Sequence, residues 1–141
     1  MSIWFKEISI KDLEGSSINM DKHLEIEFYD IGTNYLCAKM PVNEKTKQPF
    51  GLLHGGASCV LAESVASFAT ALTLDLSKQI PVGLSLNANH LKSATAGFVY
   101  AKATSKHIGR TTSLWDVVVT NEDKEIVSSV VFTAFHKDII K

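Results

Sequence analysis

The chain has 141 residues, of which 45% are hydrophobic and 21% are charged, and its formal net charge at pH 7 is -1. This length predicts one domain, 1–141, and the composition is typical of an ordinary soluble globular protein. The nearly neutral charge, with no basic stripe of interleaved aromatic residues, argues against a protein that binds nucleic acid.

The sequence shows no pattern typical of a membrane span, a signal peptide or a disulfide. No apolar run approaches about 18 residues without a polar interruption, so we expect no membrane span. The first seven residues lack the basic-then-apolar order of a signal peptide. Cys37 and Cys59 are far apart and have no metal-ligand spacing, which favours buried thiols over a disulfide or a metal site. We therefore expect a cytoplasmic protein without a metal or cofactor.

Short elements are predicted before residue 41. Ser9 is suited to cap a short helix that carries Asp12 in its first turn. Apolar residues alternate with glutamates over 24–28, which predicts a strand with one solvated face. Residues 31–34 indicate a turn, and 35–40 indicate a second strand that pairs with the first.

A long helix is predicted next, after a polar loop over 41–50. It begins near His54-Gly55-Gly56 and ends near Asp75, and no proline interrupts it. Apolar residues recur with helical period at positions 57, 61, 65, 68 and 72. The opposite face is small or weakly polar, and Glu63 is the only acid or base on it. This composition predicts a helix that is buried nearly all round.

Glu63 has no cationic neighbour in its own helix, which leaves two interpretations. It is either a structural glutamate paired with a distant cation, or a catalytic carboxylate made more basic by poor solvation. Ser67 lies four residues on, and therefore on the same face. The glycines at the helix start expose backbone N–H groups that can hold an oxyanion. Gln48 and His54 are candidates for the same site, or are simply polar loop residues.

The rest of the chain is predicted as strands. The first ends at His90, which is either an ordinary polar residue or part of a pocket lining. Two strands, one helix and a run of strands predict an α+β fold with a sheet wrapped on one helix. Because one sheet covers one side of the helix, we expect a second copy of the chain to cover the Glu63 face. The predicted strands are 80–90, 98–104, 114–120 and 126–136.

The segments Thr46–Ser58 and Leu61–Ser64 resemble the hotdog-fold acyl-CoA thioesterases. Within that family they are similar to the PaaI-like branch that cleaves aroyl-CoA thioesters such as 1,4-dihydroxy-2-naphthoyl-CoA, of menaquinone biosynthesis, or 4-hydroxybenzoyl-CoA. Asn87–Ala94 and His107–Arg110 match further family segments. The resemblance implies a long central helix wrapped by an antiparallel sheet, a thioester hydrolase, and an acyl-CoA substrate. It also implies a homodimer or a homotetramer built as a dimer of dimers, with active sites shared between chains.

The resemblance implies a role for each matching residue. Glu63 matches the catalytic carboxylate, as nucleophile or general base, and Gly55 matches the N–H that polarises the thioester carbonyl. Gln48 and His54 match residues near that carbonyl, and Ser67 matches a hydroxyl that assists water. Lysine and arginine at two of the CoA-contacting positions suit phosphates. The CoA-contacting positions are Gly83, His90, Leu91, Lys92, Ser93, His107, Ile108, Gly109, Arg110, Thr111 and Thr112.

The alternatives to an acyl-CoA thioesterase are a hotdog dehydratase and a non-catalytic acyl-CoA-binding module. A hotdog dehydratase would carry a histidine in a His-Phe-Pro setting, which the residues around His54 lack. A non-catalytic acyl-CoA-binding module would not need Glu63. A medium-chain acyl-CoA or a carrier-protein thioester remains an alternative substrate. For an aryl group we expect a narrow apolar slot walled by Val60, Phe68 and Leu91.

Overall fold

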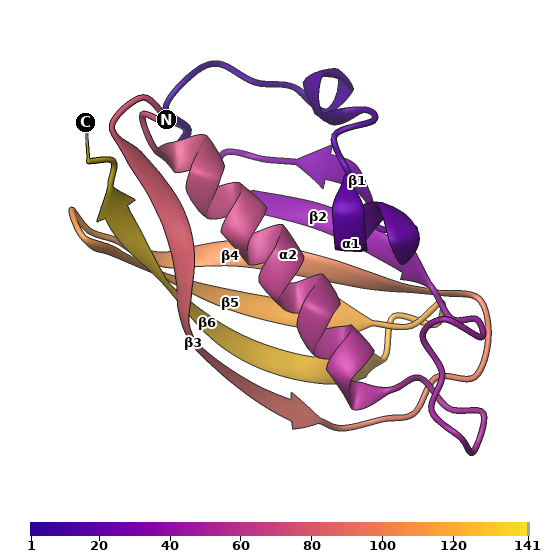
Figure 1. Ribbon diagram of the computed structural model, residues 1–141. Coiled ribbons are helices and arrows are strands. Elements are labelled where there is room, and N and C mark those ends of the chain that lie inside the picture. The colour runs from indigo at the N-terminus through magenta and orange to yellow at the C-terminus, as the bar shows by residue number, and fades with distance from the viewer. Residues whose placement is uncertain (141) are drawn as a thin grey trace.

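The computed structural model describes residues 1–140 and shows one six-stranded sheet curved around one long helix (Figure 1). The predicted α+β architecture is confirmed. The helical elements are η1 (Ile10–Leu13), α1 (Asn19–His23) and α2 (Gly55–Thr73). The strands are β1 (Glu27–Ile31), β2 (Tyr35–Pro41), β3 (Gln79–His90), β4 (Phe98–Ile108), β5 (Thr112–Thr120) and β6 (Ile126–Asp138).

The strand order is β1-β2-β4-β5-β6-β3, and all neighbours are antiparallel. The strands β1 and β3 are therefore the two edges of the sheet. One row of paired residues crosses it from β3 to β4, through Gly83, Ala134, Ser113 and Ile108. At the far end of β3, His90 is paired with Ser128. The twelve-residue strand β3 therefore has one unpaired edge, and its two ends, near Gly83 and at His90, lie in different parts of the molecule.

The core lies between α2 and the concave face of the sheet. Alternate residues of β4, β5 and β6 are buried there, as the period of a half-buried strand requires. The fully buried Trp115 donates its indole N–H to the Thr70 hydroxyl at 2.8 Å, so the polar groups of this contact are satisfied. The helix α2 is long and apolar enough to cross a membrane, but its packing on the sheet accounts for its apolar residues.

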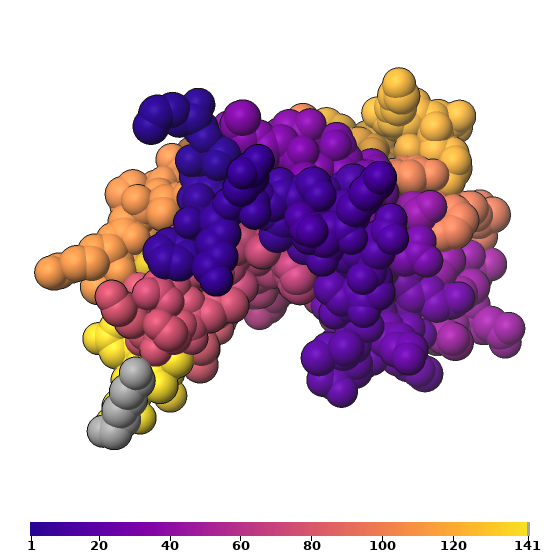
Figure 2. All heavy atoms as spheres, turned by 90° about the horizontal axis from the view of Figure 1, so that it is seen from above, coloured from indigo at the N-terminus to yellow at the C-terminus, as the bar shows by residue number. Residues whose placement is uncertain are grey.

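Two predictions near the N-terminus have different outcomes. The short helix after Ser9 is confirmed as η1, and the Asp12 carboxylate accepts from the Ser9 N–H at 2.8 Å. The strand predicted over 24–28 is wrong at its start, because α1 ends there and Glu25 has a positive φ of 61° that no strand allows. In the space-filling view these N-terminal residues cover much of the upper side of the molecule (Figure 2).

Candidate active site

Glu63 lies on α2 with its carboxylate against the edge strand β3. Its Oε2 atom is 2.5 Å from the point where a Cβ on Gly83 would stand, so the glycine leaves the space that the carboxylate occupies. The side chain is exposed in the single chain, although Ala62, Ala66 and Thr70 on the same face are buried. The single chain therefore leaves the Glu63 face of the helix uncovered, since the sheet ends at β3 beside Glu63, and burial of that face by a second copy stays a prediction.

Ser67 follows one turn later on α2 and is half-buried, in agreement with its predicted place beside Glu63. The neighbouring Ser64 has a different role. Its hydroxyl donates to the Asp21 carboxylate at 2.6 Å and so ties α2 to α1. Of these two serines, only Ser67 is left with a hydroxyl that can serve Glu63.

The start of α2 carries the predicted oxyanion site. The His54 side chain is the N-cap, and its Nδ1 accepts from the Gly56 N–H at 2.8 Å. This hydrogen bond fixes the imidazole by backbone contact. Among residues 1–140, the N–H of Gly55 makes no hydrogen bond. It therefore remains a donor at the positive end of a nineteen-residue helix, where an oxygen that gains negative charge is stabilised.

A cleft of about 400 Å³ opens in front of this helix start. The structure brings together here Gln48 from the loop and the residues predicted at the end of β3. The Gln48 amide oxygen accepts from the Phe50 N–H, which holds the loop in place. The lining residues are Gln48, Leu52, Leu53, Gly55, Ser58, His90, Leu91, Lys92, Ser93 and Val127.

His90 is held at the wall of this cleft by a residue that the sequence did not single out. Its Nδ1 lies 2.8 Å from the Ser128 hydroxyl, and its Nε2 would be 2.9 Å from a Cβ on Gly55. The Cys59 sulfur lies 4.0 Å from the same Nε2. Only strand register connects Ser128 with His90, so no local motif could have identified it. The absence of a side chain on Gly55 is what lets the imidazole approach the helix start.

The remaining predicted residues form the turn between β4 and β5, near the other end of the sheet. The Gly109 N–H donates to the Thr112 carbonyl at 2.8 Å and closes the turn. The turn carries Arg110 exposed at its tip. Ile108 belongs to the row of residues that includes Gly83. The turn and the Glu63 carboxylate therefore lie toward the same end of the molecule.

The predicted site thus falls into two groups that one chain keeps apart. Glu63, Gly83 and the Arg110 turn form the first group, and the cleft residues form the second. His90 is seven positions after Gly83 along β3, a distance of about 23 Å. Gly55 and Glu63 are about 12 Å apart along α2. Lys92 is ion-paired with Glu125 at the cleft end, so Lys92 and Arg110 of one chain do not face the same ligand.

The expected aryl slot is likewise not assembled from one chain. Phe68 packs on Phe28 of β1, with ring centroids 4.4 Å apart, whereas Glu63 faces β3 at the opposite edge of the sheet. Leu91 is 63% exposed at the cleft. Phe68 and Leu91 therefore belong to different parts of the single chain, because the apolar side of α2 turns away from the Glu63 side.

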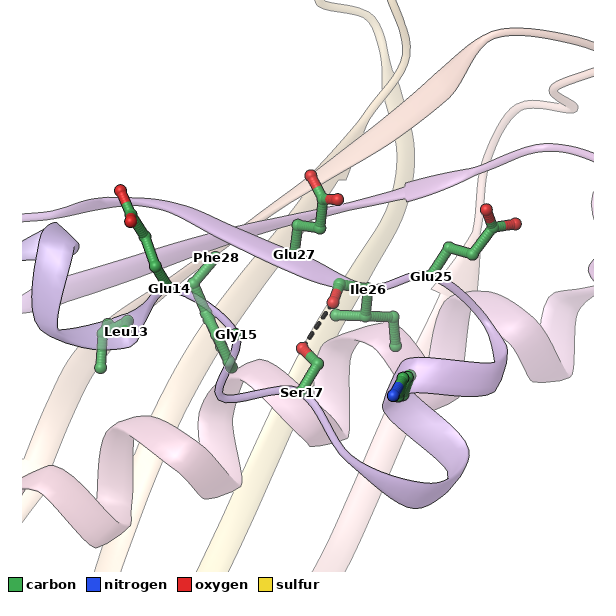
Figure 3. A pocket seen from close by; sticks show the side chains of 9 residues that line it. Leu13, Glu14, Gly15, Ser17, Glu25, Ile26, Glu27 and Phe28 are labelled. Carbon is green, nitrogen blue, oxygen red and sulfur yellow. Dashed lines mark hydrogen bonds between the residues drawn. The ribbon is translucent and has the colours of Figure 1, made fainter.

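The two larger of the other hollows lie outside both groups of site residues. The first, of about 550 Å³, lies beside β1 under the N-terminal segment, where the Ser17 hydroxyl donates to the Ile26 carbonyl (Figure 3). Three glutamates and one lysine line it, a balance that disfavours the phosphates of CoA. The second lies on the convex face of the sheet, and burial raises the pKa of its Cys37 thiol to about 11. A thiol in that state is a poor nucleophile near neutral pH.

The chain matches the Thioesterase superfamily over residues 50–128. A 1,4-dihydroxy-2-naphthoyl-CoA hydrolase from Escherichia coli is 41% identical over 128 residues, or 90% of this chain and 93% of that protein. The proofreading thioesterase EntH from Cronobacter turicensis is 38% identical over 121 residues, or 85% and 88% of the two chains. A solved mutant thioesterase from Pseudomonas aeruginosa is 39% identical with a TM-score of 0.94, over 98% of this chain and 100% of that chain.

The chain therefore belongs to the thioesterase superfamily, and its long helix on a six-stranded antiparallel sheet is the hotdog fold. It is a thioester hydrolase. The resemblance drawn from Thr46–Ser58 and Leu61–Ser64 is confirmed for the family, the fold and the class of reaction. The dehydratase and the non-catalytic binding module are disfavoured by the same comparisons.

Proposed function

We propose that this protein hydrolyses aroyl-CoA thioesters in the cytoplasm, with 1,4-dihydroxy-2-naphthoyl-CoA among its best substrates. The products are the free acid and CoA. The observation that carries the proposal is the Glu63 carboxylate, the only acid of α2, which lies against Gly83 in a fold that hydrolyses thioesters. The 41% identity to a 1,4-dihydroxy-2-naphthoyl-CoA hydrolase over nearly the whole chain supports the choice of substrate.

The chemistry needs an oxyanion donor and a carboxylate. The Gly55 N–H stabilises the negative charge that develops on the thioester oxygen. Glu63 either attacks the carbonyl carbon, so that water then opens the resulting anhydride, or takes a proton from the water that attacks. In both routes the carbon–sulfur bond breaks, the oxygen of water enters the acid, and the CoA sulfur leaves with a proton. Ser67 is placed one turn from Glu63 to orient that water.

A homodimer would join the two groups of site residues. The free edge of β3 carries exposed apolar side chains, with Leu84 62% and Val82 41% exposed. A long unpaired edge of this kind is a template for pairing with another strand. Antiparallel pairing of β3 with its copy would bring the His90 end of one chain beside the Gly83 end of the other. The proposed active site is therefore shared between two chains, each supplying one group.

We expect a dimer or a dimer of dimers in solution at micromolar concentration. The measurement is the mass by light scattering, together with specific activity over a dilution series. Replacing Leu84 with lysine places a charge at the free edge and is expected to lower the mass and the activity together. Lys39→Ala on the distant strand β2 is the matched control. A monomer with full activity would contradict the shared site.

We expect Lys92 and Arg110 to bind the phosphates of CoA, each from a different chain of the dimer. Neutralising both is expected to raise KM for an aroyl-CoA about tenfold or more, with a smaller effect on kcat, because remote phosphate contacts are largely uniform binding. The KM for the matching pantetheine thioester, which lacks the nucleotide phosphates, should rise less. Lys106→Ala is the control, since Lys106 resembles Lys92 in being exposed and ion-paired, in this case with Asp116. Equal losses on both substrates would indicate a structural role.

The acyl group is tested with a panel of four substrates. We expect kcat/KM to be highest for 1,4-dihydroxy-2-naphthoyl-CoA, followed by benzoyl-CoA and hexanoyl-CoA, with palmitoyl-CoA lowest. Several substrates should be accepted, because an apolar pocket discriminates weakly between groups that differ by a methylene or a hydroxyl. A preference for palmitoyl-CoA would overturn the aryl slot. Faster release from a carrier-protein thioester than from the matching CoA thioester would change the assigned thiol.

A further inference from the structure

His136 is a buried polar residue that the chemistry above does not use. It lies near the end of β6 and is only 2% exposed. Its side-chain and N–H hydrogen bonds go to the turn between β4 and β5 and to the start of β5. Its backbone N–H donates to the Thr111 carbonyl at 2.8 Å, its Nδ1 lies 3.2 Å from the Arg110 carbonyl, and its Nε2 lies 2.6 Å from the Ser113 hydroxyl.

The partners of the imidazole fix where its proton lies. A carbonyl oxygen can only accept, so Nδ1 carries the proton and donates to Arg110. In the neutral ring Nε2 is then an acceptor, and the fully buried Ser113 hydroxyl donates to it. Both ring nitrogens are thus satisfied, and the ring has one orientation. The His136 side chain therefore holds the turn by two hydrogen bonds, one to the Arg110 carbonyl and one to the Ser113 hydroxyl at the start of β5.

The clamped turn carries the cation Arg110. Arg110 is exposed, and among residues 1–140 no carboxylate forms an ion pair with it. Lys92, by contrast, is engaged by Glu125. An unpaired arginine on a backbone that is already fixed is suited to an anion, because little conformational freedom is lost when the anion binds.

We propose that His136 is a positioning residue for CoA binding, which holds the β4–β5 turn so that Arg110 meets a phosphate of the substrate. This inference rests on the proposed function, in which Arg110 binds CoA. His136 is not a catalytic residue, since it touches neither the thioester nor Glu63. A loosened turn must be ordered again each time substrate binds, and that cost falls on KM rather than on kcat.

Two substitutions separate the contacts of the ring. In His136→Asn the amide N–H stands near the position of Nδ1, so the bond to the Arg110 carbonyl is retained. In His136→Gln the amide reaches toward Ser113, and the bond to Arg110 is lost. We expect His136→Gln to raise KM for an aroyl-CoA about fivefold or more, and His136→Asn to raise it about twofold or less. The KM for the pantetheine thioester should change much less in both variants, and kcat should change little.

Arg110→Ala completes the experiment as a double-mutant cycle. If His136 acts through Arg110, the combination of Arg110→Ala with His136→Gln raises KM no further than Arg110→Ala alone. Thermal unfolding of every variant reports whether the fold is retained. If His136→Gln does not fold, Ser113→Ala is the second variant, with a smaller rise in KM that is again confined to acyl-CoA.

The outcomes distinguish the inference from the function on which it rests. If Arg110→Ala raises KM for acyl-CoA and the variants at His136 and Ser113 do not, the positioning role is wrong and the proposed function stands. Equal rises for acyl-CoA and the pantetheine thioester would make His136 a general structural residue. If Arg110→Ala leaves KM unchanged, the assignment of Arg110 to CoA fails, and the role of His136 fails with it.

Discussion

Glu63→Gln is expected to lower kcat by about a hundredfold or more while the fold remains intact. The amide keeps the shape of the side chain but is neither a base nor a nucleophile. Glu63 is exposed in the single chain and makes no ion pair among residues 1–140, so its replacement leaves no buried partner unpaired. The measurements are steady-state kinetics on an aroyl-CoA, and thermal unfolding to verify the fold.

The matched control is Glu7→Gln, which removes an exposed carboxylate of the N-terminal segment and should leave kcat close to that of the unmodified protein. Retention of more than about a tenth of kcat in Glu63→Gln, a loss below about 1.4 kcal/mol of barrier stabilisation, would show that Glu63 does not carry the chemistry. A loss of activity that accompanies a loss of folded protein would instead make the glutamate structural. Single-turnover measurements on the folded variant separate a slow chemical step from slow product release.

Long periodic patterns made most of the fold predictable. The helix over 55–73 and the strands after residue 79 each repeat their apolar positions often enough to identify the element and its buried face. The five-residue helix α1 has too few positions to show a period, and the strand predicted over 24–28 therefore begins too early, at residues that belong to the end of α1 and the turn after it. The strand ends differ by a few residues, because pairing in a sheet extends β4 and β5 beyond their apolar runs.

The site was predictable where its residues are close in sequence. Gly55 and Glu63 lie on one helix, whose geometry gives their separation, and Gln48 lies in the loop that precedes it. Contacts made through strand register were not predictable, such as those of Ser128 with His90. The strand that lies beside Glu63 was not predictable either, since the position of β3 at the edge of the sheet is a property of the strand order, which no local pattern specifies.

Gly83→Ala is expected to lower kcat about tenfold or more with little loss of stability, because displacing a reacting group by about 1 Å can cost two orders of magnitude in rate. The new Cβ would stand 2.5 Å from the Glu63 Oε2 atom and would displace the carboxylate. The displaced atom is the end of a flexible, exposed side chain, so the fold can accommodate the methyl group. Its next contact, with a ring carbon of Phe132, is an ordinary 3.5 Å. Kinetics and thermal unfolding of the same preparation measure the two effects.

Kinetics on an aroyl-CoA and on its pantetheine thioester distinguish two roles for Gly83. If Gly83 shapes the place of the Glu63 carboxylate, kcat falls alike for an aroyl-CoA and for its pantetheine thioester, and Gly83→Ala has no further effect in a Glu63→Gln background. If Gly83 instead contacts CoA, as the family resemblance implies, KM for the aroyl-CoA rises and the pantetheine thioester is spared. Ser85→Ala, two residues along the same edge strand, is the control for a general effect on β3. Unchanged kcat on both substrates would show that the carboxylate works from another position.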